Sequence, residues 1–265
     1  MSESTAPTLR VATYNVRGCK GIDRRRSEKR IAEVIASLPA DLVGLQELDL
    51  ARKRSAGVDQ AGLIANELGW HALFQAAVRI ADEQYGDAIV SRYPLRLQRV
   101  LPLPGQGSWY CRETRIALWA EADTPLGPVQ IVNTHFGLGR TERFLQAQFM
   151  VDAEQLGAVP ASIPLVLLGD FNSLPGSRTH RCLAGNLRDV RALLPSAGPC
   201  RTFPTRFPRV AVDHIFVNTA LSPVALAVHR TPLARAASDH YPLVAELSLN
   251  HSVNAVVDGR QEGTP

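Results

Sequence analysis

The feature that most constrains this chain is a series of short apolar segments, each with a polar or ionisable residue at one end. The clearest is predicted strand 163–169, where Leu165–Leu168 is followed by Gly169 and Asp170. Short apolar runs bounded by turn residues are typical of buried strands. The other segments place Asn15 in 9–16, Glu47 after 41–46, His135 at the end of 128–135, Asp213 and His214 in 212–217, and Asp239 and His240 before 242–248. Strand ends present side chains from a rigid frame, so we expect these groups to be functional.

Helical periodicity is confined to three segments, and β-like segments fill much of the remaining chain. Apolar residues recur at helical spacing after Ser27, a suitable N-cap, and the pattern ends before Pro39. Residues 59–68 and 141–156 predict two further helices, the first closed by Gly69 and the second capped by Thr141. Additional strands are predicted at 71–80, 85–91, 95–103, 114–122 and 223–229. This arrangement favours an α/β sandwich with two sheets face to face and helices outside.

The domain organisation predicted from the chain is simple. Residues 1–8 are expected to form a flexible leader, 9–249 a single domain and 250–265 a flexible tail. With 45% hydrophobic and 20% charged residues, the composition is that of an ordinary globular protein. There is no secretory signal or apolar run of roughly 20 residues that would span a membrane. The four cysteines lack zinc-ligand spacing, so we expect free thiols. The expected compartment is a reducing cytoplasm. We also expect the protein to be a monomer.

The residue types at the strand ends suit one kind of chemistry. Carboxylate and amide oxygens, such as those of Glu47, Asp170 and Asn15, are hard ligands suited to Mg²⁺ or Mn²⁺. Such an ion neutralises charge on a phosphoryl group, and a His paired with an Asp can orient water or stabilise developing charge. Each position alone has a structural alternative, such as a solvated strand end for Glu47 or a turn for Asp170–Asn172. The structural alternatives together are less probable than a site, because functional residue types would have to occur by chance at several separate strand ends.

Five motifs, in their order along the chain, resemble the endonuclease/exonuclease/phosphatase family. That family includes deoxyribonuclease-I-like nucleases, abasic-site endonucleases, sphingomyelinases, inositol phosphatases and deadenylases. The motifs are Thr13-Tyr14-Asn15-Val16, Gly44-Leu45-Gln46-Glu47-Leu48, Asn133-Thr134-His135-Phe136, Leu168-Gly169-Asp170-Phe171-Asn172 and Ser238-Asp239-His240-Tyr241-Pro242. The resemblance, to a small bacterial-type member, extends over about 9–248. It implies a four-layer αββα sandwich with two mostly antiparallel sheets. It also implies metal-dependent hydrolysis of a phosphodiester, or of a phosphomonoester, by in-line attack of water.

The resemblance also implies roles for individual residues. Glu47 matches the principal metal ligand, supported by Asn15 and Asp239. The other roles are water orientation or deprotonation by Asp170, phosphate contact by Asn172, His240 and His135, and support of His240 by Asp213.

Two further residues are expected near the phosphate. Asp87 stands where the matching motif often carries Asn, and we hypothesise that it pairs with His135 and favours the charged imidazole. Arg115 matches an arginine near the active face of many relatives and is a candidate phosphate contact. A surface turn for Asp87 and an ordinary strand-edge position for Arg115 are the alternatives.

The substrate is left open between two kinds of phosphate ester. The net charge of +4 and the arginines of Arg24–Arg26, Arg52–Arg54, Arg140 and Arg143 are compatible with nucleic acid. Trp109 and Tyr110 are candidates for contact with a lipid interface or a ligand, with burial in the core as the alternative. The segment Thr202-Phe203-Pro204 is similar to one in small bacterial members and in GPI-anchor lipid-remodelling proteins, which points to phospholipid or sphingomyelin-like head groups. A catalytically silent binding module of the same fold is the third alternative.

Overall fold

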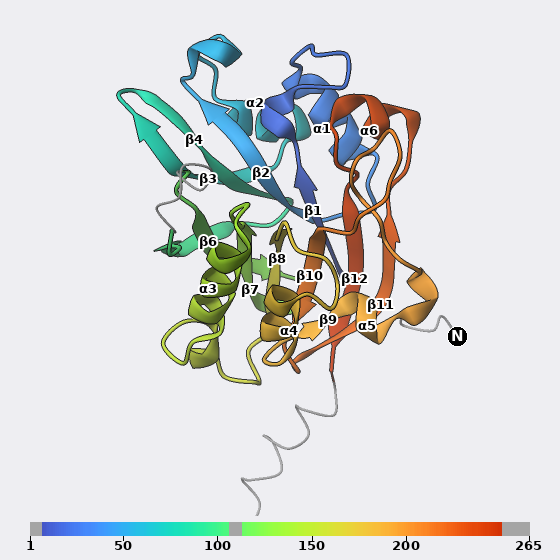
Figure 1. The fold of residues 1–265 in the computed structure, drawn as a ribbon. Helices are drawn as coiled ribbons and strands as arrows, with labels where there is room; N and C mark the ends of the chain where they lie inside the picture. Colours follow the sequence, from blue (N-terminus) through green and yellow to red (C-terminus); the bar gives the residue numbers. More distant parts are fainter. Residues whose placement is uncertain (1–6, 106–112, 251–265) are drawn as a thin grey trace, which may run out of the picture.

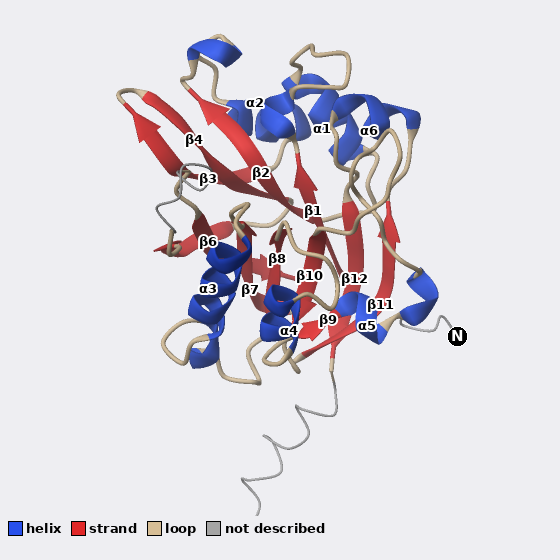
Figure 2. Cartoon of the chain, viewed as in Figure 1, coloured by secondary structure: helices blue, strands red, loops and turns tan. Residues whose placement is uncertain are grey.

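The computed structural model describes residues 7–105 and 113–250, and these form two sheets of six strands each (Figures 1 and 2). The first sheet, in spatial order, consists of β11 (Leu221–Val228), β12 (Leu243–Leu249), β1 (Leu9–Asn15), β2 (Leu42–Leu50), β4 (Glu83–Ser91) and β3 (His71–Ile80). The second consists of β5 (Leu95–Pro102), β6 (Ile116–Thr124), β7 (Gly127–His135), β8 (Leu165–Asp170), β10 (Asp213–Val217) and β9 (Arg188–Asp189). Each sheet has one parallel pair, β1 with β2 and β7 with β8, and is otherwise antiparallel.

Three apolar clusters define four layers and confirm the predicted sandwich. The central cluster packs the inner faces together, with Val11 and Leu42 from one sheet and Leu118, Val166 and Leu168 from the other. The outer clusters lie between each sheet and its helices. The first sheet is covered by α1 (Glu28–Ala36), α2 (Gln60–Leu68) and α6 (Pro232–Ala237), and the second by α3 (Arg140–Val151) and α4 (Arg178–Ala184). The short helix α5 (Val190–Leu193) lies beside β10 and β11.

Local cap chemistry explains which helix predictions are confirmed. The Ser27 side chain accepts a hydrogen bond of 3.1 Å from the Arg30 N–H, and Gly69 closes α2 in a left-handed conformation. The third helix was placed wrongly, because it begins after Gly139 rather than Thr141 and ends at Val151 rather than 156. The Glu142 carboxylate accepts from the Gly139 N–H at 3.2 Å, which sets the start of the helix two residues earlier.

The second predicted strand also differs from the structure. Instead of ending at Gln46, β2 continues to Leu50 through a bulge between Leu45 and Leu48. Glu47 lies within this bulge in a left-handed conformation, with φ of 65°. A bulge turns one side chain out of the regular alternation of a strand, and such distortions occur at sites where a side chain must be re-aimed. Glu47 is therefore presented by an irregularity inside a strand.

The remaining sequence expectations concern segments of different kinds. Trp109 and Tyr110 lie outside the described residues, as do 1–6 and 251–265. Within the described part of the chain, no helix combines the length and the apolar character needed to cross a bilayer. Helices α4, α5 and α6 were not predicted, because each is short, with seven, four and six residues, and carries little periodic signal.

Candidate active site

The strand pairing brings the predicted residues to one edge of the sandwich. In parallel pairs both carboxyl ends lie at the same edge, which places Asn15 near the bulge of β2 and pairs His135 with Asp170. The antiparallel strand β10 begins where β8 ends, and Asp213 is registered opposite Asp170. Strand β12 runs antiparallel to β1, so the loop before it carries its residues to the same edge.

Glycine is required where β8 reaches this edge. Gly169 has φ of 154°, and a Cβ atom there would lie 1.9 Å from the carbonyl oxygen of Thr134 on β7. Its absence lets the two strands approach closely immediately before His135 and Asp170. Asn172, two residues later, adopts a left-handed φ of 48°, and its N–H donates to Asp170 Oδ1 at 2.9 Å. This tight turn fixes the carboxylate and the amide relative to each other.

Oxygen-bearing side chains gather around Asn15, which is almost wholly buried. Its Nδ2 donates to Glu47 Oε1 at 2.9 Å, and the Ser238 hydroxyl donates to its carbonyl oxygen at 2.7 Å. The Arg17 N–H donates to Asn15 Oδ1 at 3.0 Å, and the Arg17 guanidinium pairs with Asp239 at 3.1 Å. Two half-buried carboxylates and an amide oxygen are a donor set of hard ligands, without sulfur or imidazole. These residues fit a cation such as Mg²⁺ or Mn²⁺.

Asp170 lies at the centre of the site and is only 2% exposed. Its Oδ2 accepts a hydrogen bond from Asn15 Nδ2 at 3.1 Å and lies 3.6 Å from His135 Nε2 and 3.7 Å from His240 Nε2. Burial raises the pKa of Asp170 to about 6, although the His240 charge opposes this shift. A carboxylate with such a pKa, facing two imidazoles, is suited to accept a proton near neutral pH.

His240 and Asp213 form a buried pair beside Asp170. His240 Nδ1 lies 2.9 Å from Asp213 Oδ2, which also accepts a hydrogen bond from the Thr202 hydroxyl at 2.5 Å. Burial favours the neutral imidazole, but the adjacent charges of Asp213 and Asp170 raise the pKa of His240 to about 10. The Phe203 ring packs on the imidazole with centroids 4.7 Å apart. His240 is thus a fixed cation whose Nε2–H is directed to the Asp170 side of the site.

His135 has the opposite protonation state. Burial and the positive charge of Arg115 hold the pKa of His135 well below its ordinary value. Arg115 can only donate, so its contact of 3.0 Å assigns His135 Nδ1 as an acceptor and leaves the proton on Nε2. Asn172 Nδ2 lies 3.2 Å from that Nε2 and already donates to the Phe136 carbonyl oxygen at 2.9 Å. The N–H groups of His135 Nε2 and Asn172 Nδ2 therefore lie side by side, an arrangement suited to bind an anionic oxygen.

The expected pairing of Asp87 with His135 is wrong. Arg115 contacts His135 Nδ1 at 3.0 Å, and the lowered pKa of His135 favours the neutral imidazole rather than the charged one. Asp87 is 3% exposed, and burial raises its pKa to about 8, although Arg115 and the Glu47 N–H favour its charged form. Its position opposite the β2 bulge makes it a support for the Glu47 backbone. Arg115 is itself buried and also pairs with Glu113 at 3.2 Å.

Two clusters of described residues each bring three groups capable of binding a metal within 4.8 Å. One consists of Asp170, Asp213 and His240, where a protonated imidazole already neutralises the carboxylates. The other lies around His180, whose Nε2 lies 2.8 Å from Asp189, and His214, whose Nε2 donates to the Ser173 carbonyl oxygen at 2.7 Å. Because protein partners occupy most of these atoms, with Asp213 Oδ1 an exception among the described residues, we regard both clusters as hydrogen-bonded networks.

Three supporting residues carried no predicted role, although the sequence analysis named the segments that contain them. Thr202 and Phe203 contact Asp213 and His240, and Ser238 holds the Asn15 backbone. The similarity of Thr202-Phe203-Pro204 to related sequences marked this segment without indicating its contacts. Its position against the imidazole follows from the loop before β10, which the chain alone does not place.

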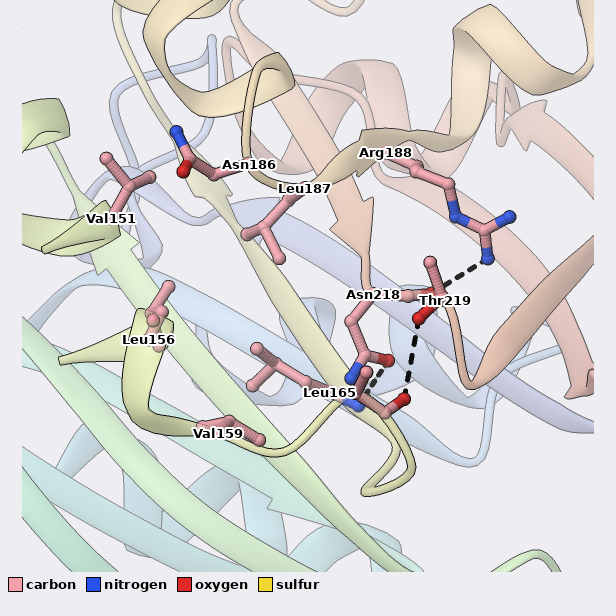
Figure 3. A pocket seen from close by; sticks show the side chains of 11 residues that line it. Val151, Leu156, Val159, Leu165, Asn186, Leu187, Arg188, Asn218 and Thr219 are labelled. Atoms are coloured by element: carbon pink, nitrogen blue, oxygen red, sulfur yellow. Dashed lines mark hydrogen bonds between the residues drawn. The ribbon is translucent and has the colours of Figure 1, made fainter. Parts of the chain in front are cut away.

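A separate cavity lies at the opposite end of β8 (Figure 3). Its lining includes Leu156, Leu165 and Asn218, and the Leu165 N–H donates to Asn218 Oδ1 at 3.2 Å. Leu165 begins β8 and Asp170 ends it, so the cavity is roughly 17 Å from Asp170 at the rise of an extended strand. None of the predicted site residues lines it, and we assign it no part in the chemistry.

Comparisons with known proteins agree with this fold. The uncharacterized protein YbhP of Escherichia coli is 26% identical over 254 residues, covering 91% of this chain and 97% of that protein. An endonuclease/exonuclease/phosphatase from Beutenbergia cavernae superposes with a TM-score of 0.74 at 25% identity, over 92% of this chain and 72% of that one. A mannosyl-6-phosphatase from Bacteroides thetaiotaomicron has the same fold, with a TM-score of 0.71 at 21% identity over 90% and 99% of the two chains. The model of the Endonuclease/Exonuclease/phosphatase family matches residues 12–240, and the chain belongs to that family.

Proposed function

We propose that this protein is a divalent-metal-dependent phosphoesterase that hydrolyses a phosphodiester by in-line attack of water. The observation that carries the proposal is the surrounding of Asp170 Oδ2 by Asn15, His135 and His240 at 3.1 to 3.7 Å. One carboxylate with a raised pKa, one cationic imidazole and one neutral imidazole face the same space. The hydrolase character of the family, whose members act on phosphate esters, supports this reading.

Glu47, Asp239 and Asn15 are the residues that would hold the ion, Mg²⁺ or Mn²⁺. When bound, a divalent ion supplies charge neutralisation at a phosphoryl oxygen and a fixed point for orienting the ester. The bulge that presents Glu47 and the contact from Asn15 Nδ2 to its Oε1 pre-set the position of the carboxylate. Among the described residues, Glu47 Oε2 accepts no hydrogen bond, which leaves it available as a ligand.

The side chains then divide the work of hydrolysis. Asp170 orients the attacking water and accepts its proton, which the raised pKa of the carboxyl permits near neutral pH. His240 holds a proton at Nε2 and donates it in a hydrogen bond to a phosphoryl oxygen, while Asp213 holds Nδ1. His135 Nε2–H and Asn172 Nδ2–H stabilise the charge that develops on the same group. No covalent enzyme intermediate is required.

A lipid head group is the second candidate substrate, because exposed apolar side chains lie on loops next to the site. Leu138 is 60% exposed after β7, Leu174 is 50% exposed after β8, and Phe207 is 69% exposed in the loop that carries Phe203. Apolar groups at the rim of a polar site suit an amphiphilic substrate. One argument for a nucleic acid substrate loses weight, because two of the arginines that could bind phosphates are already paired with carboxylates. Arg54 pairs with Asp49, and Arg52 pairs with Glu83.

A panel of substrates with Mg²⁺ or Mn²⁺ tests the proposal. It contains plasmid, abasic duplex, single-stranded RNA, bis-p-nitrophenyl phosphate, sphingomyelin and cardiolipin. We expect hydrolysis of at least one phosphodiester, stopped by EDTA and lost in Asp170→Asn with an unchanged melting temperature. Hydrolysis of lipid alone would establish the second candidate. No hydrolysis of any ester by the metal-loaded protein would favour a binding module and contradict the proposal.

We also propose that the protein acts as a monomer in the cytoplasm. The three cysteines within the described residues, Cys19, Cys182 and Cys200, are free thiols, which suits a reducing compartment. Light scattering of the purified protein should give the mass of one chain, and a stable dimer would contradict this part of the proposal.

A further inference from the structure

A second cavity, of about 470 Å³, lies beside the catalytic amide of Asn172. Its lining contains three arginines, Arg140, Arg143 and Arg178, together with hydroxyl groups, and it contains no carboxylate. A concave, acid-free surface with three guanidinium groups is suited to an anion, above all to phosphate. The cavity lies between the start of α3 and the start of α4, on the outer side of β8.

The surroundings of Arg178 differ from those of an arginine in another basic segment, Arg54. Arg54 makes a bidentate contact with Asp49 at 2.7 and 2.8 Å, so its charge is already neutralised. Arg178 instead lies over the ring of Phe144, 3.6 Å from its centroid, and forms no ion pair with an acid of the described residues. Stacking on an aromatic ring holds a guanidinium in place and leaves its donors free for a ligand.

A buried hydroxyl group in the cavity independently points to a ligand. Ser173 is 3% exposed, and its Oγ has no hydrogen-bond partner among the described residues. An unsatisfied buried hydroxyl is uncommon and costs stability. The start of α3 adds backbone donors at the same wall, because its N-cap is Gly139, which has no side-chain oxygen, and Arg140 and Thr141 line the cavity.

The location of this cavity relates it to the reaction. Asn172 lines the cavity, and its Nδ2 lies 3.2 Å from His135 Nε2 at the place assigned to the phosphoryl oxygens. We propose that the cavity binds a second phosphate of the substrate, so that the ester cleaved is one that carries two neighbouring phosphate groups. This inference rests on the proposed function and names its substrate class. Arg140 and Arg178 supply the charge, and Ser173 donates its unpaired hydroxyl proton.

Paired substrates that differ only in the second phosphate test the inference. The p-nitrophenyl ester of thymidine 5′-phosphate is compared with the same ester carrying a 3′-phosphate, using the full-length protein and Mn²⁺. We expect the 3′-phosphate to raise kcat/KM by about ten- to hundredfold, the effect of one or two charge-assisted hydrogen bonds. The double variant Arg140→Gln/Arg178→Gln should lose most of this ratio, and Ser173→Ala part of it.

Arg96→Gln is the matched control, because it removes the charge of an exposed arginine on β5 that is paired with Glu121 on β6. Its ratio between the two substrates should equal that of the wild type. Equal kcat/KM values for the two substrates in the wild type would overturn the inference, as would a ratio that the double variant retains. Because the readout is a ratio, a general loss of activity in a variant does not imitate the expected result.

A binding measurement separates failure of this inference from failure of the proposed function. Thymidine 3′,5′-bisphosphate and inositol 1,4-bisphosphate are titrated calorimetrically into the protein in EDTA, with thymidine 5′-monophosphate for comparison. At least one bisphosphate should bind more tightly than the monophosphate, and the double variant should lose that difference; the tighter bisphosphate identifies the scaffold. Bisphosphate binding without hydrolysis would contradict the proposed function alone, whereas equal binding of all three compounds would overturn the cavity assignment.

Discussion

Replacement of Gly169 by alanine should damage catalysis more than folding. The added Cβ would lie 1.9 Å from the Thr134 carbonyl oxygen, so the two must separate by at least 1.1 Å to reach the shortest distance that real Cβ atoms show, 3.0 Å. The residues that follow Thr134 and Gly169 are His135 and Asp170, which face each other across the two strands. Displacement of catalytic groups by about 1 Å costs roughly 10²-fold in rate, and overpacking costs about 1–3 kcal/mol of stability.

The assay is hydrolysis of bis-p-nitrophenyl phosphate with Mn²⁺, together with thermal unfolding followed by circular dichroism. Gly169→Ala should lose about two orders of magnitude in kcat/KM while it still unfolds cooperatively. The control is Gly105→Ala, because no atom of residues 7–105 or 113–250 lies within 4 Å of the Cβ that would be added there. Wild-type kcat/KM in Gly169→Ala would refute the close approach of β7 and β8 as the device that sets the site.

Three further perturbations follow from the contacts of individual side chains. Asp213→Asn removes the charge that holds the His240 proton, so kcat should fall by about 10²–10⁴ and the alkaline limb of the pH–rate profile should move to lower pH; an unchanged profile would contradict the pair. Burial, with Arg191 nearby, lowers the pKa of His214 to about 4, below its ordinary 6.5, so the neutral form stabilises the fold above about pH 6.5 and this contribution is lost as the pH falls towards 4. In urea titrations His214→Phe should lose less stability over that interval than the wild type, and equal losses would argue against a buried neutral imidazole. Phe171→Ala should cost about 3–5 kcal/mol in the same titrations, because Phe171 is 1% exposed and its ring packs against those of two other phenylalanines; a loss under 1 kcal/mol would contradict this packing.

Much of the site could be predicted because its residues are marked by local sequence. Asp170 and His135 follow short apolar strands, and the position of a strand end is readable from the change in residue type. Once the order of strands in the sheet is known, the parallel pairing of β7 with β8 is enough to place His135 beside Asp170. For the same reason the helix after Ser27 was predicted correctly, since the cap and the apolar face lie within a few residues.

The errors concern features that depend on pairing between distant segments. At the bulge, Gln46 and Glu47 of β2 lie opposite a single residue of β4, Asp87. No local pattern of apolar residues indicates this two-to-one pairing. Asp87 was paired with His135 on motif position alone, but Arg115, immediately before β6, contacts the imidazole instead. The arginine-lined cavity likewise joins the starts of two helices that lie 38 residues apart, from Arg140 to Arg178.

The central claim is that Glu47, Asn15 and Asp239 hold a divalent ion on which Asp170-dependent hydrolysis depends. The most direct measurement is a titration of the purified, EDTA-treated protein with Mn²⁺, in which bound ion is followed by electron paramagnetic resonance and turnover of bis-p-nitrophenyl phosphate is recorded in the same samples. We predict that turnover rises in parallel with bound Mn²⁺ in the wild type. We predict further that Glu47→Gln needs much more Mn²⁺ for both. Turnover that persists in EDTA, or Mn²⁺ binding that is unaffected in Glu47→Gln, would contradict the account.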